Sequence, residues 1–225
     1  MNFSTKEPQY TICLERLEKQ GRQSFGIMSN QTWIDDPKRL VFLLSRYKFV
    51  AKMLSGFTKV LEVGCADAFG SRIVAQEVSD LTVSDFDPVF IDDAKKRNCP
   101  PYEYKTLLHD MVEAPLTNQY DAIYALDVLE HIEKSNEISF INNMLKSLQK
   151  HGTLIIGMPS IQSQKYASPQ SKEGHVNCKD ANELKDLLSH YFHNVFIFSM
   201  NDEVVHTGFY PMANYLLALC CNPRS

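Results

Sequence analysis

Three polar side chains that could do metal or acid–base chemistry lie close together at Asp127, Glu130 and His131. Their i, i+3, i+4 spacing places them on one face if the chain is helical there. Two carboxylates and an imidazole so placed can hold a divalent cation, and a histidine from another loop could complete the ligand shell. His175, in segment 173–177, is the candidate. The sequence therefore predicts a metal site formed by Asp127, Glu130, His131 and His175.

The same residues admit two other interpretations. His131 or His175 could be a general base, with Asp127 as a third catalytic candidate, because an imidazole titrates near neutrality and can accept a hydroxyl proton. Alternatively, Glu130 and His131 only cap a turn and hold the loop. His206, in a later predicted loop, is the next candidate for the base.

A second group of residues predicts a nucleoside site. The turn 64–70 follows an apolar run, and Gly64 permits a tight bend there, while Ala66 and Ala68 leave room for a ligand. Asp85 follows the next apolar run, about 20 residues beyond the turn, where a carboxylate can accept both ribose hydroxyls. A dinucleotide is disfavoured, since Ala66 and Asp67 stand where the pyrophosphate needs open backbone.

The predicted metal-binding residues and the predicted nucleoside-binding residues lie in separate loops, so the fold must bring these loops together. Apolar runs alternate with helical patterns, which predicts a sheet with helices on both faces. Strands are expected at 60–63, 81–84, 102–108, 121–126 and 153–157, and two further strands at 195–200 and 214–221 could pair antiparallel. The predicted fold is α/β, with a doubly wound, seven-stranded, mainly parallel sheet. Ligands bind outside the carboxyl ends of strands in such sheets.

Helical periodicity and capping signals predict helices at 8–20, 37–54, 69–78, 88–97 and 135–149, with another beginning at 180. We divide the chain into an N-terminal helical cap, residues 1–56, packed on the same domain, and a core of residues 57–225. The polar stretch 160–177 is expected to be a loop.

The composition narrows the class of protein. The 225 residues suffice for one domain, and a net charge of −4 argues against nucleic acid as a partner. The six cysteines are scattered without C-x-x-C pairs, which favours a reducing compartment. The start of the chain lacks a signal-peptide pattern and no apolar run could cross a bilayer, so a cytoplasmic location with no membrane partner is expected.

Four segments carry a resemblance to a known family: VLEVGCADAFG, VSDFDP, LLHDM and YDAIYALDVLEHI. Together they resemble the class I S-adenosylmethionine-dependent methyltransferases, which implies a Rossmann-like methyltransferase fold and S-adenosylmethionine as cofactor. The resemblance implies a role for seven residues. It places the methionine part against Glu62, Gly64 and Ala66, the ribose on Asp85, and the adenine against Phe86, Asp110 and Met111. Arg46, in the predicted helix 37–54, could reach the cofactor carboxylate, and a solvated arginine is the alternative.

The segments WIDDPKR and SRYKF look like those of bacterial methyltransferases associated with surface polysaccharides and nucleotide sugars. We therefore expect O-methylation of a small polar metabolite such as a sugar or nucleotide-linked sugar. N- or C-methylation of another metabolite and a non-catalytic cofactor-binding subunit remain as alternatives. The expected partner is a small-molecule substrate, and a homodimer is left open.

Overall fold

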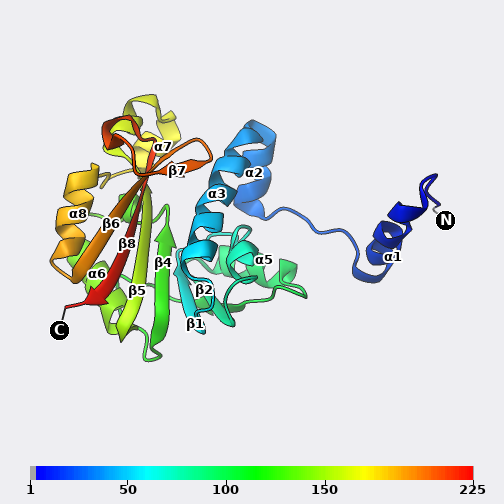
Figure 1. Ribbon diagram of the computed structural model, residues 1–225, viewed down its shortest axis with the longest axis horizontal. Coiled ribbons are helices and arrows are strands. Elements are labelled where there is room, and N and C mark those ends of the chain that lie inside the picture. The colour runs from blue at the N-terminus through cyan, green and yellow to red at the C-terminus, as the bar shows by residue number, and fades with distance from the viewer. Residues whose placement is uncertain (1–3, 225) are drawn as a thin grey trace.

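The computed structural model describes residues 4–224, and its centre is one mixed sheet with the strand order β3-β2-β1-β4-β5-β8-β6-β7 (Figure 1). The first five strands pair in parallel with their neighbours, whereas β8 is antiparallel to both β5 and β6, and β7 is antiparallel to β6. The strands are β1 (Lys59–Val63), β2 (Asp80–Asp85), β3 (Lys105–Leu108), β4 (Tyr120–Leu126), β5 (Leu148–Pro159), β6 (Phe192–Asn201), β7 (Val204–His206) and β8 (Tyr215–Pro223).

Helices cover both faces of this sheet. They are α1 (Thr11–Gln20), α2 (Ile27–Asp35), α3 (Lys38–Met53), α4 (Ser71–Val74), α5 (Pro88–Arg97), α6 (Glu137–Lys146), α7 (Pro169–Gly174) and α8 (Ala181–Ser189). Short 3-10 turns lie at η1 (Pro8–Tyr10), η2 (Leu129–His131), η3 (Ile161–Tyr166) and η4 (Tyr210–Met212).

Two buried clusters correspond to the two faces. Successive residues of a strand point to opposite faces, and in β1 Leu61 belongs to one cluster and Val60 to the other. The Leu61 cluster includes Phe140 of α6 and Leu184 of α8, and the Val60 cluster includes Val50 of α3. The central parallel strands β1 and β4 are thus buried on both sides, which confirms the predicted Rossmann-like arrangement.

The predicted count of seven strands is wrong, because the sheet has an eighth strand, β7. This strand has three residues and forms a hairpin with β6 through a turn in which Asp202 has a φ of 50°. Three residues give too little alternation for the pattern to be detected in a sequence.

Two helices lie where the sequence predicted none. In α2 Ser29 is the buried residue, so this helix has no apolar stripe to reveal it. In α7, within the stretch expected to be a loop, the Ser168 side chain accepts a hydrogen bond from the Ser171 amide and starts the helix. Local capping, which binary patterning does not detect, produces this second helix.

The N-terminal cap is not one packed unit. Helix α3 packs on the sheet, whereas no residue of α1 is buried, and Figure 1 shows α1 standing apart from the other elements. Only Leu14 and Leu17 of α1 are even half-buried, which is little apolar area to hold a helix in place. The predicted boundary between the cap and the core, at residues 56 and 57, stays a prediction. Residues 1–3 of the predicted cap and residue 225 of the predicted core lie outside the described residues.

Within residues 4–224, no helix is both long enough and apolar enough to cross a membrane.

Candidate functional site

The turn after β1 has the backbone of a close-approach loop. Gly64, Ala66 and Ala68 have φ values of 73°, 45° and 51°, in the left-handed region that costs a residue with a Cβ roughly 1–2 kcal/mol. A Cβ on Gly64 would lie 2.4 Å from Cγ2 of Val128, so glycine is required there. The two alanines adopt a backbone conformation that glycine adopts more readily. The turn that they form lies directly after β1, at the carboxyl end of the parallel strands.

Asp85 connects the end of β2 to this turn. One of its carboxylate oxygens accepts a hydrogen bond from the Ala66 amide at 2.8 Å, and the other accepts one from the Asp87 amide at 2.9 Å. The side chain is buried at 6% exposure, so it is fixed at the edge of the turn. Each carboxylate oxygen keeps a second lone pair, which is what a ribose hydroxyl would need.

Glu62 lies beneath the turn rather than in an open crevice. Its Oε1 accepts a hydrogen bond from the Tyr47 hydroxyl at 2.8 Å, and its Oε2 accepts from Ser71 at 2.5 Å and from Tyr124 at 2.8 Å. Burial raises the pKa of Glu62, and the three hydroxyls counteract part of that rise. Glu62 therefore holds β1, α3, α4 and β4 together, and its predicted contact with the methionine part stays a prediction.

The residues predicted for the adenine lie near the ends of β2 and β3. Phe86 is 71% exposed and free to offer its ring to a planar ligand. The Asp110 carboxylate accepts a hydrogen bond from the Val112 amide at 2.8 Å. Met111 is buried, and its carbonyl accepts a hydrogen bond from Asn143 at 3.0 Å, so its position is fixed by α6.

Arg46 and Asp127 form an ion pair at the end of β4. One terminal nitrogen of the guanidinium lies 2.8 Å from Oδ1 and 2.6 Å from Oδ2 of Asp127, and its Cζ lies 3.8 Å from the centroid of the Tyr215 ring. Burial acts to lower the pKa of Arg46, but the charge and hydrogen bond of Asp127, with Tyr215 and Glu130, together outweigh burial, so the pKa is raised. Asp127 has a φ of 56°, an uncommon conformation that aspartate tolerates better than most residues.

Glu130, His131 and His175 form the second part of the site. One ligand atom from each lies within 4.8 Å of the others, and the two imidazole centroids are 5.0 Å apart. Glu130 is buried, its Oε2 has no hydrogen-bond partner among the described residues, and burial followed by the Asp127 charge raises its pKa well above the ordinary value. Asp127 is not part of this three-residue group, because its carboxylate faces Arg46.

The hydrogen bonds of the two histidines fix which ring nitrogen is free. Nδ1 of His131 lies 2.9 Å from the Gly174 carbonyl, and Nδ1 of His175 lies 2.8 Å from the Gln164 side-chain oxygen. Since these oxygens can only accept, each Nδ1 carries the proton and each Nε2 keeps a lone pair. Both rings can therefore accept a proton or bind a metal through Nε2.

The sequence did not single out several residues that complete this arrangement. Tyr124 and Ser71 hold Glu62, Tyr215 lies against Arg46, and Gln164 fixes the His175 tautomer. These partners come from separate elements, so no spacing pattern in the chain could reveal them. His206 is held by Asn201 and by the Gly208 amide within the β6–β7 hairpin.

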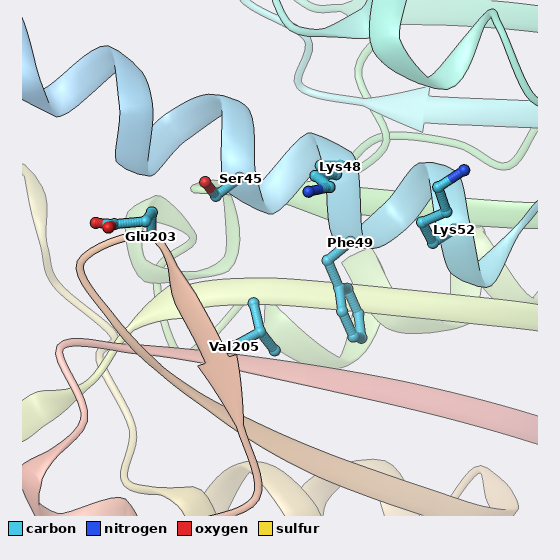
Figure 2. Close-up of a pocket in the computed structure, with 6 residues that line it drawn as sticks. All are labelled: Ser45, Lys48, Phe49, Lys52, Glu203 and Val205. Atoms are coloured by element: carbon cyan, nitrogen blue, oxygen red, sulfur yellow. The ribbon is translucent and has the colours of Figure 1, made fainter.

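A groove lies on a different part of the surface, between α3 and the β6–β7 hairpin. It has a volume of about 360 Å³, and Figure 2 shows its lining residues, Ser45, Lys48, Phe49, Lys52, Glu203 and Val205. None of the predicted cofactor residues lines it, so it is separate from the turn and the histidine cluster.

Comparison with known proteins shows which proteins this chain resembles in sequence and in structure. Residues 60–152 match the family described as "Methyltransferase domain". The chain is similar in structure to N-methyltransferase NodS from Bradyrhizobium japonicum, in complex with S-adenosyl-L-homocysteine, with a TM-score of 0.63 and 20% identity over 97% of this chain and 100% of that chain. The Rossmann-like methyltransferase fold predicted from the sequence is thereby confirmed, and residues 60–152 are similar to a methyltransferase domain.

Two curated relatives match part of the chain. The mitochondrial ubiquinone biosynthesis O-methyltransferase of Schizosaccharomyces pombe is 28% identical over 102 residues, which are 44% of this chain and 36% of that protein. Nodulation protein S of Rhizobium tropici is 26% identical over 141 residues, 60% of this chain and 59% of that protein. The matched segments thus span little more than a third and about three fifths of these relatives.

Proposed function

We propose that this chain transfers a methyl group from S-adenosylmethionine to an oxygen of a small polar acceptor, such as a sugar or nucleotide-linked sugar. The observation that carries the proposal is the meeting of two half-sites at one edge of the sheet. The turn after β1 with Asp85 is the first, and the cluster of Glu130, His131 and His175 after β4 is the second. Open α/β sheets bind ligands at this edge.

The residues present fit the cofactor. The turn brings its backbone close to any ligand at the carboxyl end of β1, and Asp85 offers carboxylate lone pairs beside it. Nε of Arg46 is buried and lacks a hydrogen-bond partner among the described residues, so a donor is available for an anionic group. Phe86 supplies an exposed aromatic face for the adenine.

The chain contributes alignment, exclusion of water and a proton acceptor. When bound, S-adenosylmethionine supplies an already activated methyl group, so little covalent help is needed. Burial and the neighbouring His131 lower the pKa of His175, so its ring is neutral at pH 7. Nε2 of His175 is the proposed acceptor of the hydroxyl proton, with His131 as the second candidate.

An amine acceptor is the second candidate, and the unpartnered Oε2 of Glu130 favours it. The cluster presents a carboxyl oxygen and two imidazole lone pairs, which suit the several N–H groups of an amine. One of the imidazoles could take the proton that an ammonium ion must lose before its nitrogen can attack the methyl group. The names of the relatives include both O- and N-methyltransferases. A non-catalytic cofactor-binding subunit remains the alternative outside enzymes, and the cytoplasmic location and the homodimer stay predictions.

A divalent cation is a further candidate occupant of the cluster. Two imidazole nitrogens and one carboxylate oxygen within 4.8 Å suit a transition metal better than magnesium, which prefers oxygen ligands. Elemental analysis of the purified protein and turnover after chelation test this role. A metal-free protein with full activity would exclude it and leave the proton-acceptor role.

Calorimetry followed by a product assay tests the proposed function. We expect S-adenosylhomocysteine to bind the wild-type protein, and Asp85→Ala to weaken binding at least tenfold, since the ribose loses its acceptor. Asp92→Ala, an exposed carboxylate on α5, is the matched control and should bind normally. Mass spectrometry with sugars and matched amino sugars then identifies the acceptor atom. No cofactor binding by the wild type would overturn the proposal, and binding without a methylated product would favour the non-catalytic subunit.

A further inference from the structure

A buried polar network lies beside the histidine cluster and is not used in the chemistry proposed above. Nζ of Lys179 lies 2.6 Å from Oε2 of Glu137, and these two side chains are 11% and 13% exposed. The side-chain amide of Asn177 donates to the same Glu137 oxygen at 2.7 Å, and its oxygen accepts a hydrogen bond from Lys179 at 3.1 Å. The side chains of Glu137, Asn177 and Lys179 therefore close a triangle of hydrogen bonds that is largely shielded from water, which we call the polar triangle.

The polar triangle joins the start of α6 to the loop that follows α7. Glu137 is the first residue of α6, whereas Asn177 and Lys179 lie between α7 and α8. The backbone of the same loop is also bound to η2, because the amides of Val176 and Asn177 both donate to the Glu130 carbonyl, at 2.9 and 3.0 Å. The loop is thus held at two points, one on α6 and one on η2.

These two attachments bear on the distance between the two histidine rings. His131 is part of η2, and His175 comes directly before the two amides that bind the Glu130 carbonyl. Residues 175–180 lie between α7 and α8, outside any helix, so their position depends on contacts of this kind. The distance of 5.0 Å between the ring centroids therefore depends on where the loop is held.

The burial of the polar triangle points to a role in geometry rather than in stability. Lys179 is 9% exposed, and lysine is seldom buried to this degree unless it is paired. Removing an ion pair from water costs about as much as its attraction returns, so apolar side chains of similar volume often give a protein of equal stability. Hydrogen bonds to charged groups also require defined distances and directions, which apolar contacts do not. The polar triangle thus fixes the position of the loop at little net gain in folding free energy.

We propose that the three residues of the polar triangle are positioning residues, which set the spacing between His131 and His175 and so direct the proton acceptor toward the acceptor hydroxyl. The inference rests on the proposed function, because the spacing affects turnover only if one of these rings takes up the proton. The three side chains hydrogen-bond to one another and act on the rings through the backbone of residues 175–177. A displacement of about 1 Å that originates far from the reacting atoms can lower a rate about 100-fold.

A variant without polar side chains in the triangle tests the proposal. It combines Glu137→Leu, Asn177→Leu and Lys179→Met, so no buried charge or side-chain amide is left unpaired, and its urea midpoint should stay within error of the wild type. Nuclear Overhauser cross-peaks between the rings of His131 and His175 measure their spacing, because the centroids are 5.0 Å apart. We expect a cross-peak in the wild type and one at least threefold weaker in the triple variant.

A milder variant, Asn177→Ala, leaves the ion pair between Glu137 and Lys179 in place and decides the question if the triple variant does not fold. Its cross-peak should be at least twofold weaker than that of the wild type. The matched control replaces an exposed ion pair of the same length, with Asp80→Leu and Lys105→Met at the starts of β2 and β3, and should leave the cross-peak unchanged. A cross-peak of wild-type intensity in the folded variants would overturn the inference.

Cofactor binding and turnover show whether the spacing matters for methyl transfer. In the triple variant S-adenosylhomocysteine should bind within twofold of the wild type by calorimetry, and kcat should fall at least tenfold for the sugar or amino sugar that the wild type methylates. Parallel losses of the cross-peak, the cofactor affinity and the urea midpoint would show a purely structural network and contradict the inference. A weaker cross-peak with unchanged kcat would refute both proton transfer by these histidines and the positioning role. A wild type that binds no cofactor would refute the proposed function, and the cross-peak would still test the spacing.

Discussion

Among single residues, Glu62 gives a pH-dependent prediction. Burial raises its pKa in the folded protein above the unfolded value of about 4.3. Its contribution to stability is therefore complete below the unfolded pKa and is lost as pH rises through the raised folded pKa. Glu62→Gln should remove this loss, so that the unfolding free energy of the variant relative to wild type increases as pH rises.

Urea denaturation at several pH values measures that difference. Glu18→Gln, on the exposed face of α1, is the control and should parallel the wild type. A Glu62→Gln curve parallel to the wild type over the same range would contradict the prediction, since it would mean that folding does not perturb this carboxyl group.

The three hydroxyls around Glu62 give a second prediction for single residues. Tyr124→Phe removes one donor from a buried carboxylate and should destabilise the protein by about 1–3 kcal/mol, because that group loses hydrogen bonding it cannot replace with water. Tyr102→Phe, at a side chain that is 40% exposed, is the control and should change stability by less than about 0.5 kcal/mol. Urea midpoints compare the two variants, and equal effects would show that Tyr124 contributes nothing specific.

Among the elements, the turn between β1 and α4 predicts opposite effects for matched substitutions. Ala66→Gly should keep or raise stability, by up to about 1 kcal/mol, because glycine adopts positive φ without steric cost. Gly64→Ala should lower stability by several kcal/mol, since the added methyl meets Val128 and the φ of 73° is unfavourable. Thermal unfolding of both variants, with Ala75→Gly in ordinary helical backbone as the destabilised control, measures this contrast.

Sequence patterns predicted the elements with strong periodicity and missed those held by local contacts. Strands β4 and β5 contain continuous apolar runs, and α5 has Asp87 as a capping residue before a proline, so these elements were recognisable. Helix α7 is short and polar, and strand β7 has only three residues, so neither shows a period. The turn of 64–70 and Asp85 were predicted from their distance along the chain. The Arg46–Asp127 pair joins residues 81 positions apart, and only the packing of α3 on the sheet determines that they meet.

For the whole molecule, the separation of α1 leads to a deletion experiment. None of its residues is buried, so removing residues 1–20 should leave the urea midpoint and slope within error of the intact protein. Deletion of a packed helix would lower both, because less surface would become exposed on unfolding. A marked fall in the midpoint would show that α1 rests on the other elements in solution.

The place of β8 in the sheet differs from its place in the chain. It lies between β5 and β6, yet it is made after both of them, so until it emerges from the ribosome the sheet has a gap with two unpaired edges. Tyr215 begins this strand, and its ring supports the Arg46 guanidinium. A growing chain could thus form the nucleoside-binding half of the site before β8 is synthesised, whereas the half around Arg46 could form only afterwards. Any quality-control factor that recognises unpaired strand edges could bind the chain during that interval.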